Sequence, residues 1–267
     1  MTCRDVEGLI IPHASGAAVP PEAAAHIGGC EHCSRLVRAF ADTNHATPPP
    51  GVLKRIEDAV VADLKPVKPL APESAQFVTL MVAASAVAAV GWAELGMAGW
   101  RALGELQRLA VFSALAASAG LLAFSLVRQI VPGGKLLAPP GLLLAAVWGG
   151  MACLFGILFR PQEEVTFVAT GLLCFKIGLE CAIPAGAVFW MILRRGASMS
   201  PALTGATAGA LAGLTGLTVL EVFCPNLNAY HILVWHLGGT LASAAGGLAL
   251  GTAVDHFAGR VRGHARL

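Results

Sequence analysis

Three residues near the start of the chain have the types and spacing of a metal-binding group. They are His26, Cys30 and Cys33, in the stretch AHIGGCEHC. On a helix, His26 and Cys30 lie one turn apart and share a face, and Cys33 follows after a tight turn. Thiolate and imidazole groups are the ligands of structural zinc, and four of them close such a site. We expect Cys3, which opens the preceding amphipathic stretch, to complete a tetrahedral Zn2+ site.

The same residues allow other interpretations. A CxxC pair is also typical of thiol redox centres, and two small cysteines can simply fill a core. The redox interpretation needs a βαβ context, whereas the flanking sequence shows only helical patterning. His13 and His32 are rival fourth ligands, although His32 lies inside the CxxC motif, where a side chain usually points to solvent. The sequence favours zinc and leaves these alternatives open.

Short helices must hold these ligands in place. Apolar residues at helical spacing indicate a first helix, at Val6, Leu9 and Ile10. A second helix begins at Pro21 or Glu22 and carries His26, and a third covers residues 34–42. The whole module, residues 1–45, is below the size at which burial alone usually holds a domain. Metal binding worth on the order of 10 kcal/mol is therefore expected to be its main stabilising contribution.

Several features of this module together resemble the zinc-binding anti-sigma domain: the early cysteine, the acidic and apolar helix, the PPEAAAH stretch and the HxxxCxxC spacing. The resemblance implies a small bacterial helical module that wraps a sigma factor and withholds it from RNA polymerase. Residues 1–70 hold 7 basic and 8 acidic side chains. A nucleic-acid-binding face would need a surplus of basic groups, so a protein partner is expected and direct contact with nucleic acid is not.

An amphipathic helix is predicted after the module, at residues 51–65. Its apolar stripe consists of Leu53, Ile56, Val60 and Leu64. In the zinc anti-sigma proteins that the chain resembles, a helix in this place clasps the sigma factor, which favours the stripe as a partner-binding surface. Alternatively, the stripe packs on the zinc module or lies on the membrane surface. A membrane-surface helix usually carries more basic residues and an aromatic residue on its apolar side. A proline-rich linker, residues 66–75, follows.

The chain as a whole is too apolar for a soluble globule. Of the 267 residues, 56% are hydrophobic and 13% are charged, and the mean hydropathy is +0.70. Apolar runs predict six membrane spans within residues 76–255, at about 76–97, 109–131, 140–159, 167–193, 202–223 and 231–254. A basic tail, residues 256–267, ends the chain. The expected fold class is all-α, a small helical zinc-binding cytoplasmic domain plus a six-helix transmembrane bundle.

Basic residues are unevenly shared between the two sides of these spans. From Lys54 onwards, 11 lie on the side of the amino terminus, and 3 lie on the other side, namely Arg101, Arg108 and Arg160. The positive-inside rule then places both termini in the cytoplasm. We expect a multi-pass protein of the bacterial inner membrane, in contact with membrane lipid.

Motifs in the membrane part carry a second resemblance, over residues of about 75–257. They are Cys181 with Pro184, LRRGAxxxP at 193–201, the small-residue run GATAGALAGLTG at 205–216, and FCP at 223–225 followed by Trp235 and His236. Together they resemble the NrsF family of six-span membrane anti-sigma factors. Such proteins usually begin with a short segment that lacks a zinc motif. The manner in which this chain holds sigma is therefore expected to follow the zinc family.

Thiols and imidazoles in the spans form a second group of interest. The candidate sensing residues are Cys153, Cys174, Cys181, Cys224, His231 and His236. The cysteines can simply be small buried hydrophobic residues and the histidines interfacial side chains, with no further function. Alternatively, these residues form a sensor, in which the thiols would oxidise to a disulfide or the thiols and imidazoles would bind a metal. The two histidines are five residues apart and do not share a face of an α-helix, which counts against a joint metal site. Glu221 is expected to reach only the interface.

Two further features of the spans bear on function. Lys176 and Glu180 lie one turn apart in the fourth span. They either form an ion pair that offsets the cost of burying both charges or belong to an ion path, and the sequence does not decide between these two interpretations. Small residues in the fifth and sixth spans favour close packing of these two helices, and they would also suit a homodimer contact.

The function expected from all of this is that of a membrane-bound anti-sigma factor. It would sequester an extracytoplasmic-function sigma factor through its zinc module, negatively regulate transcription in a stress response, and release sigma on a signal sensed by the membrane domain. The alternative is a small membrane transporter or thiol oxidoreductase with a regulatory zinc-binding tail. No reactive CxxC and no inverted repeat with broken helices are visible in the membrane half, which counts against that alternative. No catalytic constellation is visible, so an enzyme is not expected.

Overall fold

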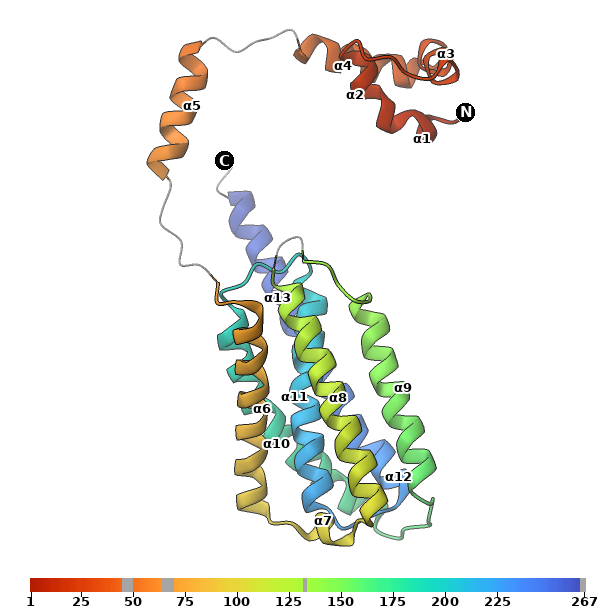
Figure 1. The fold of residues 1–267 in the computed structure, drawn as a ribbon, viewed down its shortest axis with the longest axis vertical. Coiled ribbons are helices and arrows are strands. Elements are labelled where there is room, and N and C mark those ends of the chain that lie inside the picture. The colour runs from red at the N-terminus through yellow and green to blue at the C-terminus, as the bar shows by residue number, and fades with distance from the viewer. Residues whose placement is uncertain (45–49, 64–69, 132–133, 265–267) are drawn as a thin grey trace. The chain divides into compact units, whose positions relative to one another are not determined.

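The computed structural model of the protein describes residues 1–44, 50–63, 70–131 and 134–264, and its regular elements are helices (Figure 1). The chain divides into two compact units, Met1–Lys68 and Pro69–Leu267. The expected all-α class is confirmed within the described residues, and so is the separation of an amino-terminal helical module from a larger bundle of long apolar helices.

The first unit is built from short helices. They are α1 (Cys3–Val6), the 3-10 turn η1 (Glu7–Leu9), α2 (Ile10–Ala14), α3 (Pro21–Gly29), α4 (Glu31–Asn44) and α5 (Pro50–Asp63). Its core consists of Val6, Ala23, Ile27 and Cys33. Ile10 is also buried. So few buried side chains bury little apolar surface, so the hydrophobic effect alone stabilises this module weakly.

The predicted helix boundaries in this module need one adjustment. The turn that was expected between Cys30 and Cys33 lies at Cys30 itself, which has an extended backbone and ends α3. Helix α4 then starts at Glu31, so Cys33 lies in its first turn. The backbone N–H of Cys30 donates to the His26 carbonyl over 2.9 Å, and the Cys30 carbonyl accepts from the Ser34 N–H at 2.9 Å. Cys30 is thus the corner that joins the two helices.

The second unit holds the long helices. They are α6 (Glu73–Leu95), α8 (Glu105–Gln129), α9 (Pro140–Leu158), α10 (Phe167–Leu193), α11 (Pro201–Phe223) and α13 (Leu237–His264), with α7 (Ala98–Ala102), α12 (Ala229–His231) and the π-helical turn η2 (Ile232–His236) as short elements. Six helices among the described residues are long and apolar enough to cross a membrane, the last of them running through Ala229–His256. The prediction of six spans is confirmed to this extent.

The boundaries of the bundle differ from the prediction at both ends. Glu73 lies in the predicted linker 66–75, yet it starts α6, because a carboxylate in the first turn of a helix is favoured and because Arg128 of α8 binds it. The Arg128 Nη1 and Glu73 Oε2 atoms are 2.7 Å apart. At the other end, α13 continues helically to His264, through most of the predicted tail 256–267.

Helix α11 is the central helix of the bundle. Of its apolar window 78% is buried, against 17–44% in the other five. Its glycines allow this close packing: a Cβ on Gly205 would meet the carbonyl oxygen of Gly247, and one on Gly209 would meet that of Ser243. The expected packing of the fifth span on the sixth is confirmed, and on another face Gly216 approaches Gly178 of α10.

The two ends of the bundle differ in what they carry. The chain enters α6 and leaves by α13 at the same end (Figure 1). The opposite end carries α7, α12 and the loops around them. The Lys176 Nζ and Glu180 Oε1 atoms are 3.7 Å apart, and their side chains are 71% and 60% exposed. This pair therefore lies on the outer surface of the bundle, away from any path through its interior.

Candidate functional site

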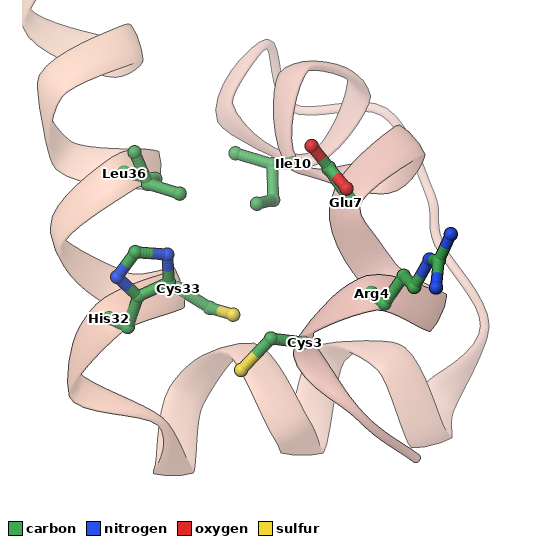
Figure 2. Close-up of a pocket in the computed structure, with 7 residues that line it drawn as sticks. All are labelled: Cys3, Arg4, Glu7, Ile10, His32, Cys33 and Leu36. Atoms are coloured by element: carbon green, nitrogen blue, oxygen red, sulfur yellow. The ribbon is translucent and has the colours of Figure 1, made fainter.

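The amino-terminal module brings the four predicted zinc ligands together. The donor atoms of Cys3, His26, Cys30 and Cys33 all lie within 4.8 Å of one another. Cys3 comes from the start of α1, His26 from α3, and Cys33 from α4, with Cys30 at the corner between the last two. Figure 2 shows the Cys3 and Cys33 side chains facing each other from α1 and α4. Residues distant in the sequence therefore converge on one point.

The start of α1 is fixed by a local cap that positions Cys3. The Thr2 backbone N–H and hydroxyl both donate to Asp5 Oδ2, at 2.7 and 2.8 Å. These hydrogen bonds, from the Thr2 backbone first and its hydroxyl second, lower the pKa of Asp5. A carboxylate in this position satisfies a helix N–H group that would otherwise lack a partner.

One distance within the group and one buried atom fit zinc, although Cys33 alone of the four residues is fully buried. The Cys3 and Cys30 sulfurs are 3.6 Å apart. This is far longer than a disulfide bond of about 2.05 Å, and it is close to the roughly 3.8 Å expected between two sulfurs at ~2.3 Å from a tetrahedral ion. The His26 Nε2 atom is buried and has no hydrogen-bond partner within the described ranges. Buried polar atoms usually have a hydrogen-bond partner, so a buried imidazole nitrogen without one is typical of a metal ligand.

The thiols of this cluster differ in acidity. A hydrogen bond from the Cys33 backbone, with a further one from the Cys3 thiol, lowers the pKa of Cys30. Burial raises the pKa of Cys33 to about 11. Cys33 therefore stays protonated at neutral pH unless a cation offsets the cost of burying its thiolate. The chemistry of the donor set thus calls for a positive charge at its centre.

The rival ligands lie elsewhere. His32 is exposed and lines a pocket of about 230 Å³ beside the cluster (Figure 2). The other residues of that pocket are Cys3, Arg4, Glu7, Ile10, Cys33 and Leu36. His13 is half-buried in α2 and does not belong to the group of four.

The predicted partner-binding stripe is uncovered. Leu53, Ile56 and Val60 of α5 are 50%, 55% and 57% exposed. Leu64, the fourth residue of the stripe, lies outside the described residues. Three large apolar side chains on one face of a helix, each at least half exposed, are typical of a surface that another molecule covers.

The membrane bundle brings four of the six candidate sensing residues together. The donor atoms of Cys174, Cys224, His231 and His236 lie within 4.8 Å of one another, and all four residues are buried. Cys153 is exposed and Cys181 is half-buried, and neither belongs to this cluster. The cluster lies at the end of the bundle that carries α12, opposite the end where the chain enters α6 (Figure 1).

The argument from spacing against His231 and His236 is wrong. It assumed an α-helix, whereas the intervening residues form the π-helical turn η2. In this turn the Leu237 N–H donates to the Ile232 carbonyl, five residues back. Residues five apart are therefore brought onto one face. The two imidazole rings are 5.1 Å apart at an angle of 80°.

Two carboxylates that the sequence did not assign to this cluster adjoin it. Glu221 is buried, contrary to the expectation that it reaches the interface, and its Oε1 atom lies 2.9 Å from His236 Nδ1. Its position one helical turn before Cys224 was the available signal. Glu164 comes from the loop after α9, where no periodicity points to it, and its Oε2 atom lies 3.8 Å from His231 Nδ1.

Glu164 is held by neighbours on two other segments. Asn226 Nδ2 donates to both its carboxylate oxygens at 3.0 Å, and Thr170 Oγ1 donates to Oε1 at 2.8 Å. Burial acts to raise the pKa of Glu164, but these hydrogen bonds and the nearby His231 outweigh it, so the pKa is lowered. The carboxylate is therefore charged at neutral pH and available to the imidazole.

Asn228 ties the two loops of this end together. Its Nδ2 atom donates to the Gln162 carbonyl at 2.8 Å, while its Oδ1 atom accepts from the Gln162 N–H at 3.1 Å. The same Oδ1 accepts from the Tyr230 N–H and caps α12. The loop that carries Glu164 is thus fixed against the helix that carries His231.

Comparison with known proteins gives the family. A family model described as "NrsF: Negative regulator of sigma F" matches residues 60–254. The "Probable anti-sigma-F factor NrsF" of Azospira oryzae is 31% identical over 136 residues, which cover 49% of this chain and 63% of that relative. The chain thus spans less than two thirds of the relative's length, and no solved structure matches it. Because the family match covers five of the apolar helices, nearly all of the sixth and most of the chain, the protein belongs to the NrsF family of negative regulators of sigma F.

Proposed function

We propose that this protein is a membrane-bound anti-sigma factor that sequesters an extracytoplasmic-function sigma factor through residues 1–63. Membership of a family of negative regulators of sigma F supports a sigma factor as the partner. The observation that carries the proposal is the uncovered stripe of Leu53, Ile56 and Val60 on α5. It lies directly after a four-ligand Cys and His cluster, in the part of the chain that precedes the bundle.

Zinc gives the module its shape in this proposal. Bound by Cys3, His26, Cys30 and Cys33, the ion would tie α1, α3 and α4 to one centre. With few buried apolar side chains in the module, metal binding supplies much of its folding free energy. The chemistry that zinc supplies is structural, because four protein ligands leave no open position for a substrate. The protein acts as a regulator and not as an enzyme.

The location follows from the partner. Sigma factors act in the cytoplasm, so the module and both termini lie on that side of the bacterial inner membrane, as the basic residues favour. The bundle then senses a signal from the opposite side and changes the grip on sigma, which negatively regulates transcription in a stress response. Candidates for this sensing are Cys174, Cys224, His231 and His236, which form one cluster, and Cys153 and Cys181, which lie apart from it.

Co-purification tests this proposal. The full chain would be solubilised from membranes that also contain each candidate extracytoplasmic-function sigma factor in turn. We expect one of these to be recovered with the wild-type chain, and to be lost with Ile56→Asp, which places a charge in the stripe. Ala62→Asp is the matched control, because Ala62 is exposed on the opposite face of α5. Recovery of sigma with all three chains alike would contradict the assignment of the stripe.

A further inference from the structure

We propose that Cys174, Cys224, His231 and His236 form a second metal centre, a closed tetrahedral site for zinc at the end of the membrane bundle opposite the point where the chain enters α6. The site is separate from the amino-terminal cluster and is argued from its own contacts. It stands whether or not the chain binds a sigma factor.

Two separations between donor atoms are close to those expected around a tetrahedral ion, and all four atoms lie within 4.8 Å of one another. The Cys174 and Cys224 sulfurs are 3.6 Å apart, and Cys224 Sγ lies 3.7 Å from His231 Nε2. Ligand distances of ~2.3 Å for sulfur and ~2.0 Å for nitrogen imply separations of about 3.8 Å between two sulfurs and about 3.6 Å between sulfur and nitrogen. The sulfurs are also too far apart for a disulfide bond of about 2.05 Å.

The imidazole of His236 is arranged as a metal ligand. Its Nδ1 atom lies 2.9 Å from Glu221 Oε1, so this nitrogen carries the proton that the carboxylate accepts. Its Nε2 atom is then unprotonated in the neutral ring, and it is buried with no hydrogen-bond partner among the described residues. A carboxylate behind a histidine that presents its other nitrogen is the usual support of a zinc ligand.

His231 also has a carboxylate near its Nδ1 atom, but at a distance too long for a hydrogen bond. Its Nε2 atom faces Cys224, while its Nδ1 atom lies 3.8 Å from Glu164 Oε2. Each histidine of the cluster therefore has a carboxylate on the side away from the sulfurs. The two carboxylates come from different segments, α11 and the loop after α9, and of the two it is Glu221 that lies within hydrogen-bond distance of its histidine.

The proposed metal centre explains why the chain forms the π-helical turn η2. A π-helical turn is rarer than an α-helical one and occurs mostly at functional sites. Here it inserts one residue between α12 and α13, and the insertion aligns His231 with His236. Without it, residues five apart would lie 140° apart around an α-helix.

Charge balance also favours a divalent ion. The four ligand residues are buried, and burying thiolates without a cation is costly. Two thiolates with two neutral imidazoles neutralise a divalent ion, so the ion and its four ligands together carry no net charge. Two sulfur and two nitrogen ligands in a tetrahedron select zinc among common ions, and four protein ligands make the site structural. The ion would tie α10 to α11 and to the start of the last helix.

Zinc content of the full chain tests the proposal. Purified in detergent, the wild-type protein should contain two zinc ions per chain, and the double variant Cys30→Ser and Cys33→Ser should retain one. Adding Cys224→Ser to that double variant should remove the remaining ion. Cys181→Ser is the matched control, because Cys181 lies in the same helix as Cys174 but outside the cluster, and it should leave the content unchanged.

A milder variant guards against loss through misfolding. Glu221→Gln keeps the shape of the side chain, and we expect it to weaken zinc binding roughly 10–100-fold while an excess of zinc restores full occupancy. The proposal is overturned if the double variant Cys30→Ser and Cys33→Ser contains no zinc, or if adding Cys224→Ser to it leaves its zinc content unchanged. It is also overturned if Cys174 and Cys224 are recovered as a disulfide. Sigma co-purification is scored separately, so failure here leaves the proposed function intact.

Discussion

His236 Nδ1 and Glu221 Oε1 lie 2.9 Å apart, and the two side chains are only 1% and 2% exposed. They join the first turns of the last span to the end of α11, the central helix of the bundle. A hydrogen-bonded pair this deeply buried is costly to break, because the remaining partner keeps its desolvation cost without its hydrogen bond. The pair is therefore a structural link as well as a support for the proposed metal centre.

Removal of the carboxylate should destabilise the bundle. We expect Glu221→Ala to lower the free energy of unfolding by about 3–5 kcal/mol if the pair is ionised, and by about 1–3 kcal/mol if it is neutral. Glu180→Ala is the control, since the exposed Lys176–Glu180 pair should contribute at most about 0.5 kcal/mol. Thermal unfolding of both purified variants in the same detergent makes the comparison, and equal midpoints would refute the structural role of Glu221.

The packing of α11 on α13 should depend on single glycines. A Cβ at Gly209 would meet the Ser243 carbonyl, whereas one at Gly246 would meet no atom within 4 Å. Gly209→Ala is expected to destabilise the bundle by about 1–3 kcal/mol, because the two helices must move apart. Gly246→Ala should be tolerated. Thermal midpoints and the yield of monodisperse protein measure the difference, and equal behaviour of the two variants would contradict this packing.

Acid should weaken the end of the bundle that carries Glu164. Its pKa is lowered in the folded protein from an ordinary value of 4.5. Since the folded pKa is below the unfolded one, the stability that this carboxylate contributes is fully present above pH 4.5 and is lost as the pH falls through the folded pKa. A stability profile from pH 7 to pH 3 should therefore fall less steeply for Glu164→Gln than for the wild type. Superimposable slopes would rule this contribution out.

If the four Cys and His ligands hold the proposed zinc ion, the amino-terminal module should lose its fold when that ion is removed. Chelation of zinc from the full chain is expected to make residues 1–44 sensitive to protease, because the small core holds them weakly alone. Cys33→Ser should have the same effect without a chelator, and Cys153→Ser, at an exposed position outside both clusters, should have none. A module that stays resistant after its zinc is gone would show that the core suffices.

Much of this architecture follows from local patterns in the sequence. The spacing of His26, Cys30 and Cys33, on and between two consecutive helices, identified the cluster in the module, and long apolar runs identified the six helices that could span a membrane. Both signals depend on regular helical geometry, which residue spacing reports directly. The resemblance to NrsF proteins, based on motifs spread over the spans, is confirmed by the family match.

The remaining features depend on irregular geometry or on tertiary contact. The convergence of His231 and His236 needs a π-helical turn, for which spacing rules give no warning. Glu164 lies near His231 because Asn228 positions its loop through a hydrogen bond with Gln162, 66 residues away in the sequence. Glu73 joins α6 because Arg128 of another helix binds it. The last two depend on a partner that is distant in the sequence, and the first on a local departure from α-helical geometry.

Transcription in a reconstituted system tests the central claim most directly. The full chain, placed in lipid nanodiscs, would be added to core RNA polymerase, its extracytoplasmic-function sigma factor and a promoter that this sigma factor reads. The account predicts that transcription falls as the chain approaches equimolarity with sigma, and that Ile56→Asp restores it while Ala62→Asp does not. Transcription that stays unchanged at a molar excess of the wild-type chain would contradict it.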